Sequence, residues 1–230
     1  MPVRAVFFDM DDTLVDYTAS AHVGLHETAL EVHALVPEIP AGAFLRAYEN
    51  LPRAMTHDRA THGSQHQIAD ALAACGIDKP RTARAMYDHY LKSRLEVITL
   101  MPGAIEALHF LRQHCTVGLL SNGLVRTRQT TMSRLGLQGL LDPVLISEQE
   151  MLEKPDPRFF QRALTRAGTG PDDTVLVGDS LSADIAGAHG AGWRSVWLNP
   201  SGANRPPAYP VPDWQIRSLH GLPSILFPPE

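Results

Sequence analysis

Five short apolar runs, separated by helix-like segments, limit the folds open to this sequence more than any other feature. The runs are Val3–Phe8, Thr116–Ser121, Val144–Ser147, Thr174–Val177 and Ser195–Leu198. Each is unbroken and rich in β-branched or bulky apolar residues, as in a strand that is covered on both faces. The alternation of such runs with helix-like segments predicts an α/β fold, in which a Rossmann-like parallel sheet has right-handed crossovers.

Two of the helices between these runs have clear starting signals. Pro102-Gly103 precedes Ala104–His114, whose apolar residues fall at helical spacing. Asp156-Pro157 is typical of an N-cap followed by proline at the first helical position. We therefore expect helices to begin near residues 104 and 157.

The stretch of residues 16–92 interrupts the alternation of strands and helices. It contains no convincing strand, and helix-forming residues dominate His22–Val36 and Gln65–Ala74. We expect a core domain made of residues 1–15 and 93–230, with a helical domain of residues 16–92 inserted after the first strand.

Composition and charge restrict the partners. The net charge of −5 over 230 residues gives no basic field for a nucleic-acid backbone. No uncharged run approaches the roughly 18 residues of a membrane helix, and the N-terminus lacks a secretory signal pattern. Cys75 and Cys115 form no CxxC pair, which fits a reducing compartment. We expect a cytoplasmic monomer or homodimer with neither a nucleic-acid nor a membrane partner.

Polar side chains follow four of the apolar runs, at the carboxyl ends where parallel sheets bind their ligands. In chain order they are Asp9, Asp11, Ser121, Asn122, Lys154, Asp179 and Asp184. Carboxylates about 4 Å apart repel by several kcal/mol in a protein-like dielectric, so a cation is expected among them. The all-oxygen donors favour Mg²⁺, which keeps waters and accepts a phosphate oxygen in its shell.

This pattern resembles the haloacid dehalogenase-like (HAD) superfamily of phosphohydrolases. The matching motifs are Asp9-x-Asp11-x-Thr13, Ser121, Lys154 and Gly178-Asp179-x-x-x-x-Asp184. The resemblance spans the chain from Val6 to about Pro200, and the combination is specific although a single DxDxT motif is not. It implies a HAD-like core, and a helical insertion directly after the first motif resembles the C1 cap of the first subfamily.

The resemblance implies a two-step transfer of a phosphoryl group. Asp9 would attack phosphorus to form an aspartyl-phosphate. Asp11 would protonate the leaving alkoxide and later take a proton from the attacking water. The expected function is therefore that of a Mg²⁺-dependent phosphomonoester hydrolase.

The same resemblance implies how the site balances its charge. Mg²⁺ would be held by Asp9, Asp179 and the backbone carbonyl of Asp11. The phosphate would be bound by the Ser121 hydroxyl, the Asn122 backbone N–H and the Lys154 ammonium. Thr13 and Asp184 are expected to support this set without touching the phosphate.

Two branches of the superfamily share further motifs with the chain. Ser121-Asn-Gly-Leu, Lys154-Pro-Asp-Pro and Val177–Ile185 resemble the nucleoside 5′-monophosphatases and the N-acylneuraminate 9-phosphatases, although Met151 stands where glycine is usual. The expected partner is a small phosphorylated metabolite. A nucleoside 5′-monophosphate is one candidate and a sugar phosphate is the alternative, because residues 16–92 carry no motif that identifies it.

Other activities remain open on the same scaffold. Asp11 argues against a dehalogenase, because a halide leaves without a proton. A phosphonatase would need a lysine of the inserted domain, where Lys79 and Lys92 are the only ones between the first two motifs. A phosphomutase, and a noncatalytic binding protein, are the remaining alternatives.

A second metal site is an alternative reading of His57, His62 and His66. His62 and His66 have the i, i+4 spacing of a zinc-binding helix, but Gly63 lies between them. We interpret these histidines as exposed or substrate-facing residues of the inserted domain.

Overall fold

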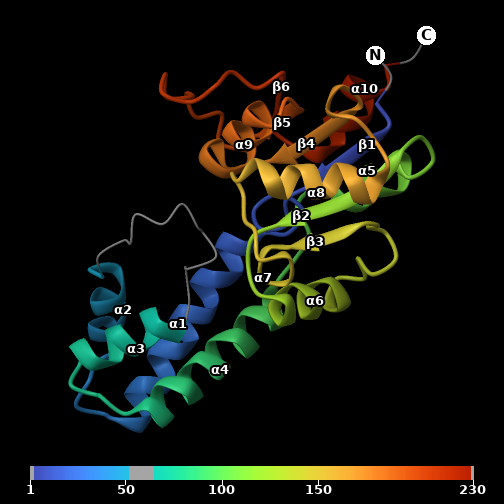
Figure 1. The fold of residues 1–230 in the computed structure, drawn as a ribbon. Helices are drawn as coiled ribbons and strands as arrows, with labels where there is room; N and C mark the ends of the chain where they lie inside the picture. The colour runs from blue at the N-terminus through green and yellow to red at the C-terminus, as the bar shows by residue number, and fades with distance from the viewer. Residues whose placement is uncertain (1–2, 52–64, 229–230) are drawn as a thin grey trace. The chain divides into compact units, whose positions relative to one another are not determined.

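The computed structural model describes residues 3–51 and 65–228, and the chain divides into two compact units (Figure 1). The first unit comprises Met1–Asp16 and Leu100–Glu230, and the second comprises Tyr17–Thr99. Each unit has its own core of buried apolar side chains.

A parallel sheet of six strands forms the centre of the first unit. The strands are β1 (Ala5–Phe8), β2 (Thr116–Ser121), β3 (Val144–Ile146), β4 (Thr174–Gly178), β5 (Arg194–Leu198) and β6 (Trp214–Ile216). Their spatial order is β3-β2-β1-β4-β5-β6. The sheet confirms the predicted Rossmann-like α/β fold, and β1 to β5 coincide with the five apolar runs. The sixth strand, β6, was not predicted.

The register of the central strands brings their carboxyl ends to one edge of the sheet. In β1, Phe8 lies opposite Leu119 of β2 and Val177 of β4. The hydrogen bonding between β1 and β4 continues one residue beyond β1, since the Asp9 N–H donates to the Val177 carbonyl at 2.9 Å. The residues that directly follow these strands therefore lie close together.

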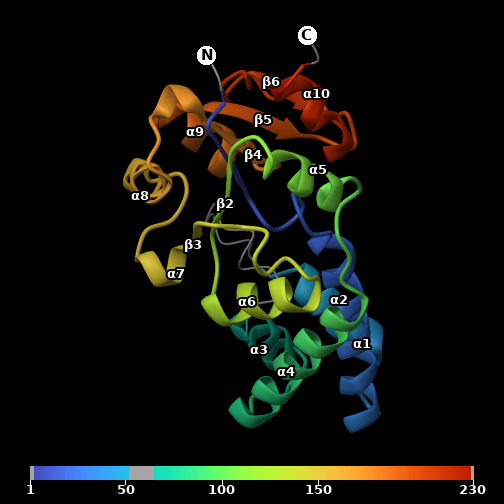
Figure 2. The ribbon, with the colours of Figure 1, turned by 90° about the vertical axis from the view of Figure 1, so that its right-hand side faces the viewer.

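Helices cover both faces of the sheet (Figure 2). On one face lie α8 (Pro157–Ala167) and α9 (Ala186–Gly190), and on the other lie α5 (Ala104–Leu111) and α10 (Leu222–Leu226). Phe159 and Phe160 of α8 are completely buried and join Phe7 in one apolar cluster. Burying a phenylalanine side chain contributes roughly 1.5–3 kcal/mol, so α8 is a major source of core stability.

The predicted helix starts are confirmed, and one predicted end is wrong. The Asp156 carboxylate accepts a hydrogen bond from the Arg158 N–H at 2.9 Å, so it caps α8, with Pro157 as first helical residue. The helix α5 begins at Ala104 but ends at Leu111, before the predicted His114. The His114 N–H bonds to the Leu111 carbonyl, three residues back, because the chain tightens before β2.

The second unit consists of helices. They are α1 (Tyr17–Leu35), α2 (Ala41–Glu49), α3 (Gln65–Ala74) and α4 (Pro80–Val97), and no strand occurs in residues 17–51 or 65–99. The helices α1 and α4 pack closely at Gly24, where a Cβ would lie 2.9 Å from the Tyr90 ring. One turn further along α4, the guanidinium of Arg94 lies 4.6 Å from the centre of the Tyr17 ring.

In residues 3–51 and 65–228, no helix has both the length and the apolar character needed to cross a membrane.

Candidate active site

The first strand ends in a tight turn that carries two of the predicted site residues. Asp9 follows β1 directly, and Asp11 comes after one intervening residue; both are largely buried. The backbone N–H groups of Leu14 and Val15 both donate to the Met10 carbonyl at 3.0 Å, which closes the turn. Asp12 has φ of 57°, a left-handed conformation that aspartate tolerates better than most residues.

Lys154 lies between two carboxylates. Its Nζ is 2.6 Å from Asp9 Oδ1 and 2.7 Å from Asp184 Oδ1, and its side chain is almost entirely buried. Burial alone would lower the pKa of the Lys154 amine, but the Asp184 and Asp9 carboxylates raise it above its usual value. The amine is therefore charged at neutral pH, and it offsets part of the acidic charge.

The backbone of Lys154 is held by the loop after β2. The side-chain amide of Asn122 donates to the Lys154 carbonyl at 3.0 Å, and its oxygen accepts from the Lys154 N–H at 2.8 Å. Sequence reasoning placed Asn122 at the phosphate through its backbone N–H. Its side chain has a second role, because it fixes the position from which the lysine reaches Asp9.

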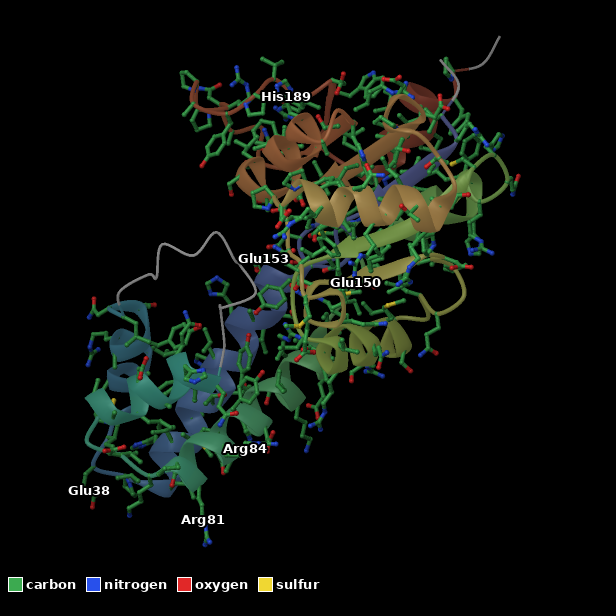
Figure 3. The ribbon with its side chains drawn as sticks, viewed as in Figure 1. Glu38, Arg81, Arg84, Glu150, Glu153 and His189 are labelled. Atoms are coloured by element: carbon green, nitrogen blue, oxygen red, sulfur yellow. The ribbon has the colours of Figure 1, made fainter. Side chains whose placement is uncertain are left out.

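An ion-pair clamp holds the segment that leads to Lys154. Glu150, at the end of α7 (Ser147–Glu150), lies beside α8 (Figure 3). Its carboxylate accepts from Arg162 at 2.9 Å and from Arg166 at 3.0 Å. Met151 follows with φ of 54°, which explains why glycine suits this position.

Asp184 is buried on a π-helical turn, η3 (Leu181–Ile185). One carboxylate oxygen contacts Lys154, and the other accepts from the Ser180 N–H at 2.9 Å. Gly178 makes room for this arrangement, since a Cβ there would lie 2.3 Å from Asp184 Cγ. π-Helical turns are rare and often occur at functional sites.

Three carboxylates form a cluster that fits a metal ion. Asp9, Asp179 and Asp184 each have one oxygen within 4.8 Å of the others. Asp179 is half-buried, and its backbone carbonyl accepts a hydrogen bond from Trp197 Nε1 at 3.0 Å. This donor set consists of oxygens alone, which suits Mg²⁺.

Two of the predicted site residues, Ser121 and Thr13, have uncharged hydroxyl side chains. Ser121 ends β2 and is completely buried; its hydroxyl is 3.3 Å from the Asn122 carbonyl. Thr13 is also completely buried, and its hydroxyl has no hydrogen-bond partner in the part of the chain that the structure describes.

Sequence reasoning missed one charged residue of the site, Arg128. It lies on α6 (Val125–Arg134), is 5% exposed, and places Nη2 2.6 Å from Asp11 Oδ2. Its Nε also donates to Ser121 Oγ at 3.1 Å. The helical phase could have indicated it, because Arg128 shares one face of α6 with the buried Thr131 and Met132.

The described residues do not form the alternative metal site of His57, His62 and His66. His66 is exposed on α3, and His57 and His62 lie outside the described residues. Within residues 3–51 and 65–228, the aspartate cluster is the one group of three side chains that could hold a metal ion.

The parallel sheet, with aspartates and a buried lysine at the carboxyl ends of its strands, defines a Rossmann-like α/β protein with a candidate active site at that edge. The comparisons identify it more closely. Residues 3–192 match the model of the haloacid dehalogenase-like hydrolases, and the chain belongs to this family.

Named relatives cover nearly the whole chain. It is 28% identical to the N-acylneuraminate-9-phosphatase of Rattus norvegicus, over 97% of this chain and 94% of that protein. It is also 28% identical to the pyrimidine 5′-nucleotidase YjjG of Escherichia coli (strain K12), over 96% of each chain. The HAD hydrolase YfnB of Bacillus subtilis has the same fold, with a TM-score of 0.78 at 24% identity over 99% of this chain and 100% of that one. The chain is thus a HAD-type phosphatase, an enzyme that hydrolyses phosphoric monoesters.

Proposed function

We propose that this phosphatase acts on a small phosphorylated metabolite through an aspartyl-phosphate on Asp9, with Mg²⁺ as its cofactor. The observation that carries the proposal is the environment of Asp9. Its carboxylate lies at the edge of the sheet formed by the carboxyl ends of the strands, bound to a charged lysine and clustered with Asp179 and Asp184. An anionic oxygen held in this way can attack phosphorus without a separate base.

The proposed reaction has two half-reactions. In the first, Asp9 attacks phosphorus, the bond from phosphorus to the ester oxygen breaks, and Asp11 gives a proton to the departing alkoxide. In the second, water attacks the phosphorus of the aspartyl-phosphate, the bond from phosphorus to the Asp9 oxygen breaks, and Asp11 takes a proton from that water. Inorganic phosphate leaves, and both aspartates return to their starting states.

Mg²⁺ would be held by Asp9, Asp179 and the backbone carbonyl of Asp11. When bound, it supplies positive charge that offsets the repulsion between the carboxylates and the phosphate. The geometry of Asp184 supports a role behind these ligands, because both its oxygens already have partners in Lys154 and Ser180. Thr13, whose hydroxyl is buried at the base of the turn, remains a supporting residue in this proposal.

The protein's own residues would bind the phosphate on its other side. The Lys154 ammonium, which lies 2.6 Å from Asp9, would attract a nonbridging oxygen. Ser121 and the Asn122 backbone N–H would donate to the remaining oxygens at the end of β2.

We propose a nucleoside 5′-monophosphate or a sugar phosphate as the substrate. The relatives support both classes, because one is a pyrimidine 5′-nucleotidase and another an N-acylneuraminate-9-phosphatase. We propose that the helical unit Tyr17–Thr99 is the cap that selects between them. A phosphomutase remains the second candidate, because it would use the same aspartates but return the phosphoryl group to substrate.

We further propose that the enzyme works in the cytoplasm as a monomer or homodimer, without nucleic-acid or membrane partners. The two cysteines support a reducing compartment, because Cys75 and Cys115 are both free thiols. The net charge of −5 supports the exclusion of nucleic acid.

A panel of nucleotides and sugar phosphates tests the function, with phosphate release measured in Mg²⁺ and in chelator. We expect release that requires Mg²⁺ and falls at least about 10³-fold in Asp9→Asn. Asp172→Asn is the matched control, because Asp172 is exposed on a short 3₁₀ turn away from the site. Turnover that persists in Asp9→Asn would contradict the proposed nucleophile.

A further inference from the structure

Arg128 forms a bridge between the proposed proton donor and the loop expected to bind phosphate. Its guanidinium contacts three groups at the carboxyl ends of β1 and β2. Nη2 is 2.6 Å from Asp11 Oδ2, Nε is 3.1 Å from Ser121 Oγ, and both nitrogens contact the Asn122 carbonyl, at 2.5 and 3.1 Å. A planar guanidinium with several fixed contacts determines the direction of the carboxylate that it binds.

The fold is built around this guanidinium. Gly123 has φ of 133°, and a Cβ on it would lie 2.6 Å from Arg128 Nη2, so a larger residue would displace the arginine. The helix α6 is anchored one turn earlier, where the Val125 N–H donates to Glu148 Oε2 at 2.7 Å. Arg128 therefore projects from an anchored helix over a glycine.

Arg128 also contributes to the charge of the site. Asp9, Asp179 and Asp184 form a cluster of three carboxylates, and Lys154 offsets one of their negative charges. Arg128 supplies a second buried positive charge, in direct contact with Asp11. A phosphate dianion that enters the site therefore meets less repulsion than the aspartates alone would produce.

We propose that Arg128 is a positioning residue for phosphoryl transfer, which holds the Asp11 carboxyl where the leaving oxygen departs. The inference rests on the proposed function, because Asp11 must act as the proton donor. It adds a specific consequence: Arg128 matters most for esters whose leaving group needs a proton. Nitrophenolate leaves readily without one, whereas an alkoxide does not.

The test compares kcat/KM for p-nitrophenyl phosphate with kcat/KM for the fastest alkyl phosphate of the panel. This constant covers the steps through phosphorylation of Asp9, in which the leaving group departs. In Arg128→Gln we expect kcat/KM for the alkyl ester to fall by roughly 100-fold. The fall for the aryl ester should be smaller by a factor of about ten or more. An equal loss for both esters overturns the proposal, since loss of charge or of folding affects both alike.

Three further variants complete the test. Arg126→Gln is the matched control, because Arg126 is exposed on the same helix, and we expect no change. Arg128→Lys keeps the positive charge but lacks the planar guanidinium, and it replaces Arg128→Gln in the test if that variant does not fold. It should still show the loss that is specific to the alkyl ester. Activity on the alkyl ester equal to that of the unaltered enzyme would overturn the positioning role. In an Asp11→Asn background, Arg128→Gln should cause no alkyl-specific loss, and such a loss would show that Arg128 does not act through Asp11.

These outcomes separate the inference from the proposed function. If the unaltered enzyme releases phosphate from no ester in Mg²⁺, the proposed function fails. If it hydrolyses both esters and Arg128→Gln lowers kcat/KM equally for the two, only the proposed role of Arg128 is wrong.

Discussion

Lys154→Met should destabilise the sheet-containing unit strongly when metal is removed. Methionine keeps most of the length of the lysine side chain but removes the charge that lies 2.6 and 2.7 Å from Asp9 and Asp184. At an effective dielectric constant of about 20, each such contact has a Coulomb attraction of about 6 kcal/mol, before the cost of desolvation is subtracted. The two carboxylates, with oxygens within 4.8 Å of one another, would then repel by about 3.5 kcal/mol.

The net loss is smaller than these Coulomb energies, because burying the lysine is itself unfavourable. Removing one partner of a buried ion pair typically costs about 3–5 kcal/mol, and we expect that loss in the free energy of unfolding. Urea denaturation in chelator measures it, with tryptophan fluorescence as the probe. Trp193, Trp197 and Trp214 are the chain's three tryptophans, and all belong to the sheet-containing unit.

Two variants give this measurement its controls. Lys92→Met removes an exposed lysine of the helical unit and should change stability by less than about 0.5 kcal/mol. Adding Asp184→Asn to Lys154→Met should recover part of the loss, because one buried carboxylate then remains unpaired instead of two. A loss below about 1 kcal/mol for Lys154→Met in chelator would refute the reasoning, since the buried ion pairs would then contribute almost nothing.

Three further predictions concern stability, metal binding and thiol reactivity. Met151→Gly should raise the free energy of unfolding by about 0.5–1 kcal/mol, because methionine at φ of 54° is strained and its side chain is 86% exposed; a decrease in urea denaturation would contradict this. Mg²⁺ titration should change the tryptophan fluorescence, because Trp197 donates to the Asp179 carbonyl, and Trp197→Phe should abolish most of the change. In Cys75→Ser, the remaining Cys115 should react with thiol reagents about tenfold faster per pH unit up to about pH 11, because burial raises its pKa to about 11 and only the thiolate reacts; a rate that levels off near pH 9 would disprove it.

The sequence was sufficient to predict the strands whose residues are buried on both faces of the sheet. Residues 5–8 of β1 are completely buried, and this environment requires the unbroken apolar run by which the strand was predicted. The short β6 gave no such signal. Trp214 and Gln215 are half-buried and exposed, and only Ile216 is buried, because an edge strand is covered less completely.

The residues of the candidate site that belong to a sequence motif were predicted, whereas contacts that depend on packing were known only from the structure. Asp9, Asp11 and Asp184 were predicted because they follow buried strands in the order and spacing of the HAD motifs, at the edge where parallel sheets bind ligands. Asn122 was predicted for its backbone, whereas the structure shows its side chain holding the backbone of Lys154, 32 residues away. No local pattern specifies such a pairing, because it depends on how two loops meet.

Arg128 shows what a sequence reading of charged helices overlooks. The sequence of α6 is strongly polar, and Arg126, Arg128 and Arg134 look alike in it. Burial distinguishes Arg128, and its cost must be offset by contacts, which Asp11, Ser121 and the Asn122 carbonyl provide. A buried ion pair contributes little stability beyond what apolar residues in place of both partners would give, so the pairing of Arg128 with Asp11 is better explained by the reaction. The leaving-group comparison, and not a melting curve, therefore decides the role of Arg128.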